Sequence, residues 1–144
     1  MSDTDPRTKL FEQIGLQQKL FSRPDLQSAL QLSKQRGQKV GDVLVEQGTL
    51  TREQLRGLDR AVTYRVGRDE DKEIAKIIVD SSYCDPASVE AALKRQKDFY
   101  SKTGELVRLG TLLVEGQELT ESQKIAAHKI HRIEQQASAP NKGP

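Results

Sequence analysis

The stretch VGDVLVE at Val40–Glu46 decides the fold, because it recurs twice further along the chain. The second copy is IAKIIVD at Ile74–Asp80 and the third is LGTLLVE at Leu109–Glu115. Each copy reads aliphatic, small, polar, aliphatic, aliphatic, valine, acid, and the copies begin 34 and then 35 residues apart. A period of this length indicates a repeated supersecondary unit.

Each copy has apolar residues at positions i, i+3 and i+4, as Val40, Val43 and Leu44 do in the first. This spacing is typical of one face of a helix, so we expect three short helices of about two turns. A buried strand is the competing interpretation, because short runs of valine and leucine suit both structures.

Longer helices with capping signals are predicted between and after the copies. Their ranges are Pro24 to about Gln35, Thr51 to about Val66, Asp85 to about Ser101, and Thr120 to about Gln136. Two of these helices begin with a threonine followed three residues later by glutamine, and a third begins with Asp85-Pro86. Gly67 is a plausible stop for the second. The last helix places Ala126, Ile130, Ile133 and Ala137 on one apolar face.

The predicted fold is therefore all-α, with repeated short-helix and long-helix units packed as a small helical bundle. Residues 9–136 form the helical domain, with 9–66 and 74–136 as candidate subdomains. Between these subdomains, residues 67–73 read as a charged, solvated linker. The polar residues 1–8 and 137–144 read as disordered tails.

Composition excludes several classes of protein. The 144 residues carry 23 basic and 21 acidic side chains, and a net charge of +2 argues against a nucleic-acid polymer as partner. No apolar run is long enough to insert into a membrane, and the polar N-terminus argues against a signal peptide. The single cysteine, Cys84, aligns with Leu50 and Leu119 and reads as a small core residue of a cytoplasmic protein.

The residues around the first and third copies resemble the N-terminal domain of type II secretion and type IV pilus assembly ATPases. Some members of that family bind cyclic di-GMP through a signature that begins R-L-G-x-x-L and ends in glutamine. Matching positions are Lys39, Val40, Gly41 and Leu44 in the first copy, Gln96 after the second, and Arg108, Leu109, Gly110 and Leu113 in the third. The signature is incomplete in each copy; in the first, Asp59 and Val62 replace its later leucine and glutamine.

The resemblance implies a free-standing accessory module, since the chain contains no P-loop sequence. It also implies cyclic di-GMP as a ligand for the matched residues. From the residues alone, Lys39 and Arg108 suit either a phosphate or guanine contact or a solvated cation beside a packing glycine. Gln96 suits either a ligand contact or a structural amide bonded to the backbone.

Two other groups are candidates for binding. Arg60, Tyr64 and Arg68 lie at i, i+4 and i+8 opposite the apolar face of their helix, as a surface for a protein partner or as plain solvated residues. His128 and His131 have a spacing that can serve a metal, but two exposed histidines are the expected arrangement.

No catalytic arrangement stands out, so the sequence predicts a non-enzymatic adaptor or regulatory module without a resident cofactor. By resemblance, its protein partners belong to bacterial secretion, pilus, motility or signalling machinery. A cyclic di-GMP sensor is the first alternative. An α-solenoid scaffold unrelated to secretion is the second.

Overall fold

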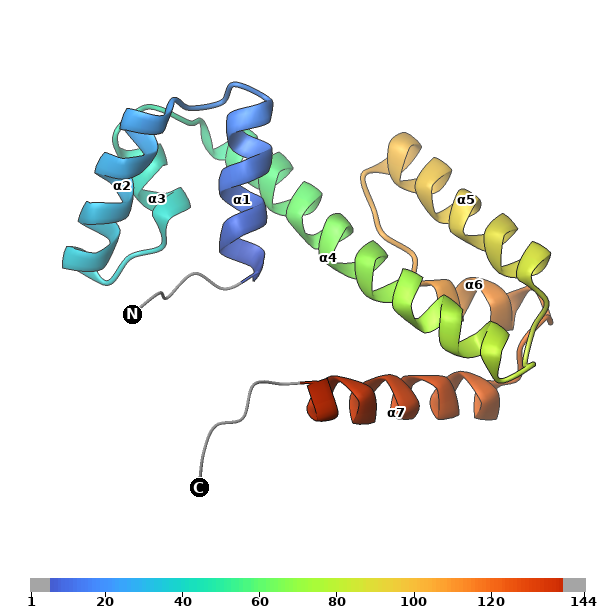
Figure 1. Cartoon of the computed structure of the whole chain (residues 1–144). Coiled ribbons are helices and arrows are strands. Elements are labelled where there is room, and N and C mark those ends of the chain that lie inside the picture. Colours follow the sequence, from blue (N-terminus) through green and yellow to red (C-terminus); the bar gives the residue numbers. More distant parts are fainter. Residues whose placement is uncertain (1–5, 139–144) are drawn as a thin grey trace. The chain divides into compact units, whose positions relative to one another are not determined.

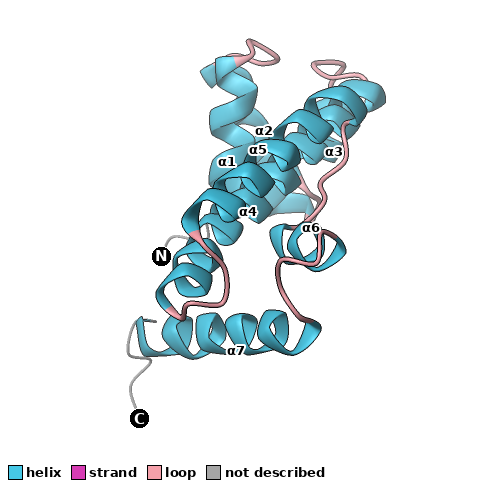
Figure 2. Cartoon of the chain, turned by 90° about the vertical axis from the view of Figure 1, so that its right-hand side faces the viewer, coloured by secondary structure: helices cyan, strands magenta, loops and turns pink. Residues whose placement is uncertain are grey.

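A computed structural model describes residues 6–138, and within them every regular element is an α-helix (Figure 1). The helices are α1 (Pro6–Gln17), α2 (Arg23–Arg36), α3 (Val40–Glu46), α4 (Arg52–Asp80), α5 (Pro86–Thr103), α6 (Leu109–Glu115) and α7 (Glu121–Ser138). No strand occurs in this part of the chain, as the second view shows (Figure 2). The all-α prediction is confirmed, and α3 and α6 are helices rather than buried strands.

The chain divides into two compact units within α4, one up to Val66 and one from Gly67 on. Each unit has its own apolar core. The first core contains Phe11, Phe21, Leu26, Ala29, Val43, Leu44, Leu50, Leu58 and Val62. The second core contains Ile74, Ala75, Ile77, Ile78, Val89, Ala92, Leu109, Leu113, Leu119 and Ala127. Unit 1 and unit 2 denote these two parts below.

The same turn joins two helices four times. Its central residue has a positive φ and follows the end of a helix; these residues are Lys19, Gly48, Ser82 and Gln117. In each turn the next residue donates a backbone hydrogen bond five residues back, as Thr49 does to Leu44 at 3.0 Å. This is the Schellman arrangement, which satisfies carbonyl groups at a helix end. Ser82 and Gln117 adopt the left-handed conformation without being glycine, so the glycine of the first repeat is not a requirement of the turn.

A capping residue starts the next helix three positions after each of these turns. Thr51 and Gln54 exchange hydrogen bonds of 3.0 and 2.9 Å, and Thr120 and Gln123 exchange two of 3.0 Å. Asp85 accepts from the backbone of Ser88 at 2.8 Å, with proline in the first turn. The predicted caps are confirmed, and each satisfies a backbone N–H group that a helix start leaves unpaired.

The first of the four turns follows α1, a helix that the repeat pattern did not predict. In the other three turns, the residue four positions before the left-handed residue is large: Leu44, Ile78 and Leu113. In α1 this position is Gly15, and a Cβ there would lie 2.1 Å from the ring of Phe21. The phenylalanine fills the space that a leucine or isoleucine fills elsewhere, so the repeat survives in three dimensions while its pattern is lost.

The prediction of a linker at residues 67–73 is wrong, because helix α4 includes these residues. Gly67 does not end the helix, which continues through residues 67–73 and takes in the second copy of the repeated segment. Gly67 is buried, and a Cβ there would lie 2.4 Å from the side chain of Leu106. The glycine therefore serves close packing. At the chain ends, residues 6–8 belong to α1, residues 137–138 belong to α7, and the remaining residues of both expected tails lie outside the described ones.

Helix α7 is rotated relative to its predicted apolar face. Ala127 and His131 are its buried residues, whereas Ile133 and Ala137 are exposed and Ala126 and Ile130 are half-buried. The predicted burial of Ala126, Ile130, Ile133 and Ala137 as one set is therefore wrong. The expected exposure of the two histidines is wrong as well, because His128 is half-buried and His131 is buried. The ring of His131 lies 2.7 Å from a carboxylate oxygen of Glu73 on α4.

Candidate functional site

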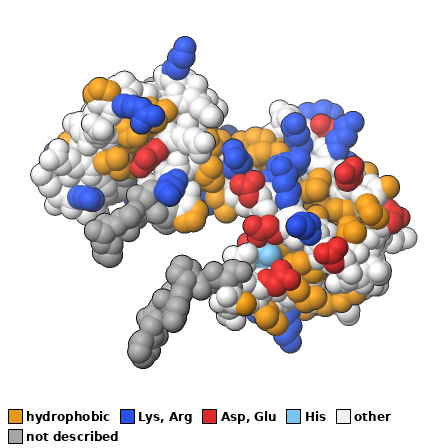
Figure 3. All heavy atoms as spheres, in the orientation of Figure 1, with side chains coloured by type: hydrophobic (Ala, Val, Ile, Leu, Met, Phe, Trp, Pro, Cys, Tyr) orange, Lys and Arg blue, Asp and Glu red, His pale blue; other side chains and the backbone are white. Residues whose placement is uncertain are grey.

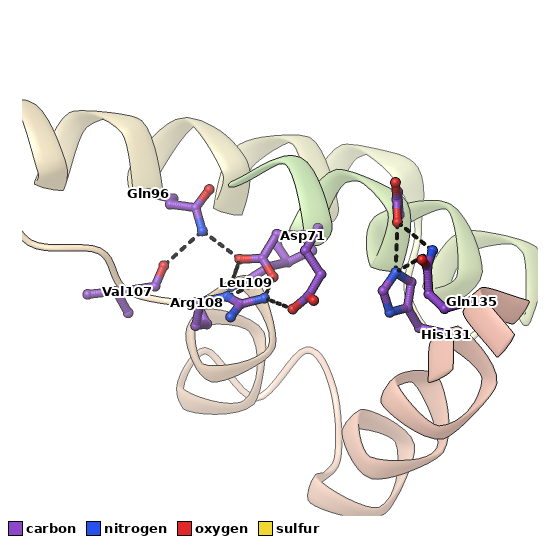
Figure 4. Close-up of polar contacts among 9 residues, drawn as sticks. Asp71, Gln96, Val107, Arg108, Leu109, His131 and Gln135 are labelled. Carbon is purple, nitrogen blue, oxygen red and sulfur yellow. Dashed lines mark hydrogen bonds and ion pairs between the residues drawn. The ribbon is translucent and has the colours of Figure 1, made fainter. Parts of the chain in front are cut away.

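Asp71 is the centre of the most connected polar cluster in unit 2. Asp71 is only 1 % exposed. It lies in the segment of α4, residues 67–73, for which the sequence predicts a solvated linker. One carboxylate oxygen accepts hydrogen bonds from the backbone of Leu109 at 2.8 Å and from Gln96 at 2.7 Å. Both oxygens also accept from Arg108, at 2.8 to 3.1 Å (Figure 4). Asp71 therefore joins α4, α5 and the start of α6.

Arg108 and Gln96 complete this cluster. The guanidinium of Arg108 also pairs with Glu70, and the hydrogen bonds that Arg108 donates to Asp71 raise the pKa of Arg108 above its ordinary value. Gln96 is fully buried, donates to the backbone carbonyl of Val107 at 2.9 Å, and accepts from Arg68 at 3.2 Å. Every hydrogen bond of Gln96 is therefore made within the fold, which supports its interpretation as a structural amide.

Unit 1 repeats part of this arrangement with different residues. Ser33 occupies the position of Gln96, eleven residues after its helix cap, and its hydroxyl donates to the backbone carbonyl of Gln38. Lys39 occupies the position of Arg108 and is exposed. In both units, then, a polar side chain on the long helix holds the loop that leads into the short helix.

The glycines of the resembling motif are packing residues in this fold. A Cβ on Gly41 would lie 2.5 Å from Leu55, and one on Gly110 would lie 3.0 Å from Lys124, which occupies the equivalent position in unit 2. Leu44, Leu109 and Leu113 are fully buried, and Val40 is half-buried. The nine residues matched to the family signature thus lie in two separate groups. Lys39, Val40, Gly41 and Leu44 belong to unit 1, and Gln96, Arg108, Leu109, Gly110 and Leu113 belong to unit 2.

The structure differs from the predicted partner surface of Arg60, Tyr64 and Arg68 at one residue, Arg68. Arg60 is exposed and Tyr64 is half-buried on the part of α4 that belongs to unit 1. Arg68, by contrast, is half-buried in unit 2 and donates to the backbone carbonyl of Leu93 at 2.9 Å and to Gln96. The prediction that Arg68 extends an outward surface is therefore wrong: its charge is used inside the fold.

The exposed ridge of α4 extends toward the helix start instead. Arg52, Arg56 and Arg60 follow one another at intervals of four residues, and all three are exposed. None of them has a hydrogen bond or ion pair within residues 6–138. Gly57 is exposed beside them, and a Cβ on it would meet nothing within 4 Å. We call Arg52, Arg56, Gly57, Arg60 and Tyr64 the α4 face.

Besides Arg108, three titratable side chains have shifted pKa values. Partial burial lowers the pKa of His128, and the positive charge of Arg108 lowers it further. Partial burial raises the pKa of Asp59, against the charges of Arg7 and Lys39. Burial also raises the pKa of the half-buried Cys84 thiol, which packs against the core of unit 2.

We expect the stability of the fold to fall with acidification in part through His128. The folded chain binds this proton less tightly than the unfolded chain does, so stability decreases as the pH falls below the ordinary pKa of 6.5 toward the lowered value. Urea denaturation at about pH 7.5 and about pH 5.5 measures the decrease. His128→Gln should show a smaller decrease than the unaltered chain; an equal decrease in both proteins contradicts the assignment.

Residues 6–138 contain no group of three or more histidine, cysteine or carboxylate side chains placed to hold a metal ion. None of the helices in this range combines the length and the apolar character needed to cross a membrane. The two histidines lie on the same helix, and His131 is paired with Glu73.

No protein-family model, curated protein sequence or solved structure matches the chain.

Proposed function

We propose that this chain is a non-enzymatic adaptor that binds an acidic protein partner through the α4 face. The observation that carries the proposal is the ridge of Arg52, Arg56 and Arg60, which is exposed and unpaired within the described residues. A helix surface that contributes nothing to its own core has no structural need for three arginines at this spacing. Arginine is also among the residues that dominate binding energy at protein interfaces.

Charge supports an acidic partner. Residues 1–66 contain 11 basic and 8 acidic side chains, whereas residues 67–144 contain 12 basic and 13 acidic ones, so the excess positive charge of the protein lies in unit 1. Residues four apart on a helix are separated by about 6 Å along its axis. A partner helix with carboxylates at the same interval could therefore pair with successive arginines, each of which can bind a carboxylate with two parallel hydrogen bonds.

Gly57 supplies a further reason and a prediction. An exposed glycine within a helix costs about 1 kcal/mol relative to alanine, and nothing in the fold requires it here. Gly57→Ala should raise the free energy of unfolding by about 0.5–1 kcal/mol in urea denaturation. It should also weaken partner binding, because a partner approaches most closely at the residue without a side chain. A variant of lower stability would contradict the open environment of Gly57.

On the resemblance alone, we propose that this adaptor acts in the cytoplasm of a bacterial cell, with partners in secretion, pilus or motility machinery. Cyclic di-GMP sensing is the alternative, and it predicts heat on titration of the chain with that nucleotide. The contacts of Arg108 and Gln96 favour the adaptor, because both side chains already bind groups within the fold.

The proposal is tested by capture of a partner from a lysate of the source organism on the immobilised chain. Arg60→Glu should reduce recovery of that partner at least about tenfold. Arg36→Glu is the matched control, because Arg36 is equally a cation of unit 1 but lies on α2 and pairs with Glu46. Equal recovery by Arg60→Glu and Arg36→Glu would contradict the role of the α4 face.

A further inference from the structure

Helix α7 exposes two large apolar side chains on its outer surface. Ile125 is 60 % exposed and Ile133 is 57 % exposed, with the exposed cation Lys129 midway between them. Hydrophobic side chains are visible along the lower edge of unit 2, where α7 lies, with a cationic side chain beside them (Figure 3). Isolated exposed isoleucines are ordinary, but two on one helix face, with half-buried Ala126 beside the first, form an apolar strip that Lys129 interrupts.

This strip occupies the same place in unit 2 as the α4 face occupies in unit 1. The capping residues Thr51 and Thr120 are 69 residues apart, and the same offset relates the two surfaces. It pairs Gly57 with Ala126, Arg60 with Lys129, and Tyr64 with Ile133. The other two arginines of the α4 face are not repeated, since Arg52 pairs with Glu121 and Arg56 with Ile125. Each unit thus presents a small residue, then a cation, then a large residue with an apolar body, at positions i, i+3 and i+7 of its last long helix.

We propose that the outer face of α7, formed by Ile125, Ala126, Lys129 and Ile133, is a second docking surface for an acidic amphipathic helix. This inference rests on the proposed function of the equivalent α4 face, and it makes the chain bivalent for one class of partner. The occupant carries apolar side chains that cover the two isoleucines and a carboxylate that meets Lys129.

Charge and side-chain size select this occupant. A second copy of the chain would bring Lys129 and Arg132 to both sides of the interface, whereas an acidic helix neutralises them. Helices that lie in a membrane surface use large apolar residues such as tryptophan, phenylalanine and leucine. Helix α7 contains none of these three residue types, and its Ala126 lets another helix backbone approach closely.

Fluorescence anisotropy with a labelled synthetic helix tests the proposal. One face of the peptide carries leucine, glutamate and leucine at positions i, i+4 and i+8. The chain used is the Arg60→Glu variant, which disables the α4 face, so the remaining binding reports α7 alone. In this background, Ile133→Ser and Lys129→Glu should each weaken binding about tenfold. A peptide with lysine in place of its glutamate should regain affinity for the Lys129→Glu variant.

Two controls match these changes on another helix of the same unit. Phe99→Ser removes an exposed apolar side chain of α5, and Lys97→Glu reverses an exposed charge there. Both should leave peptide affinity unchanged, and all variants should keep the melting temperature of their background. Equal effects of Ile133→Ser and Phe99→Ser, or no measurable binding, would overturn the proposal.

Other occupants give different results. A wild-type chain that dimerises in light scattering, but is monomeric as Ile133→Ser, would assign the strip to a second copy and overturn the acidic helix. Binding to anionic lipid vesicles that Ile133→Ser abolishes, without binding to the peptide, would overturn it in favour of a membrane surface. Peptide binding to α7 in the Arg60→Glu background, with unchanged affinity and stoichiometry in the wild type, would support this surface while contradicting the α4 face.

Discussion

Replacing Asp71 with alanine should lower the free energy of unfolding by about 3–5 kcal/mol. The substitution removes a carboxylate that is almost fully buried and accepts hydrogen bonds from Leu109, Gln96 and Arg108. It leaves the buried backbone N–H of Leu109 without this partner and Arg108 without its main counter-charge. Unpaired buried groups of this kind carry the full desolvation penalty. Urea denaturation monitored by circular dichroism measures the loss.

Asp98→Ala is the control for this change. Asp98 is an exposed carboxylate of α5 in the same unit, and its removal should alter stability by no more than about 0.5 kcal/mol. If Asp71→Ala and Asp98→Ala lower the free energy of unfolding by the same small amount, Asp71 does not hold α4, α5 and α6 together. The contribution of Glu70 should be much smaller than that of Asp71, since Glu70 is partly exposed and surface ion pairs contribute little.

Gly15→Leu should lower the free energy of unfolding by about 3 kcal/mol or more. A Cβ at Gly15 overlaps the ring of Phe21, so the larger side chain forces the turn between α1 and α2 apart. Gly15→Leu combined with Phe21→Leu should recover most of the stability, because the turn after α3 uses leucine at both equivalent positions, Leu44 and Leu50. Thermal denaturation of the single and double variants measures the recovery.

Gly57→Leu provides the matched control, since a side chain at Gly57 meets open space. It should not lower stability. A double variant at positions 15 and 21 that is no more stable than Gly15→Leu would show that the first turn is not equivalent to the other three.

The repeat and its caps were predictable because they are local. Each predicted helix start depends on a cap and a residue three positions later, as at Thr51, Asp85 and Thr120. The apolar spacing of Val40, Val43 and Leu44 likewise lies within one segment. The first turn was not predictable in this way. Its pattern differs because Gly15 is smaller than the residue at this position in the other turns and the ring of Phe21 fills the space. This compensation is recognisable only once the two residues are known to be in contact.

The buried cluster was missed for a different reason. The density of charge at residues 67–73 favours a solvated segment, but Asp71 lies three and seven residues before Ile74 and Ile78 and so shares their helix face. That spacing was a signal for burial. The carboxylate reaches the core because Arg108 and the start of α6 meet it there, and these partners are distant in sequence. The buried face of α7 was missed in a similar way. His131 lies on that face and contacts Glu73, a partner distant in sequence.

The candidate surface on α4 was predictable in position but not in extent. The helical phase of Leu58 and Val62 correctly placed Arg60 on the opposite, exposed side. The assignment of Arg68 failed, because the end of the same helix belongs to unit 2, where Arg68 has partners on α5. Arg52 and Arg56 continue the ridge at the same interval, and their spacing was already present in the sequence.

Photo-crosslinking from the α4 face tests the adaptor function most directly. A benzophenone amino acid is placed at position 60 in one variant and at position 36 in another, and each is irradiated in a lysate of the source organism. The account predicts a crosslinked protein that forms from position 60 but not from position 36, and whose acidic segment carries the crosslink. The same products from both positions, or none from position 60, would contradict a partner at the α4 face.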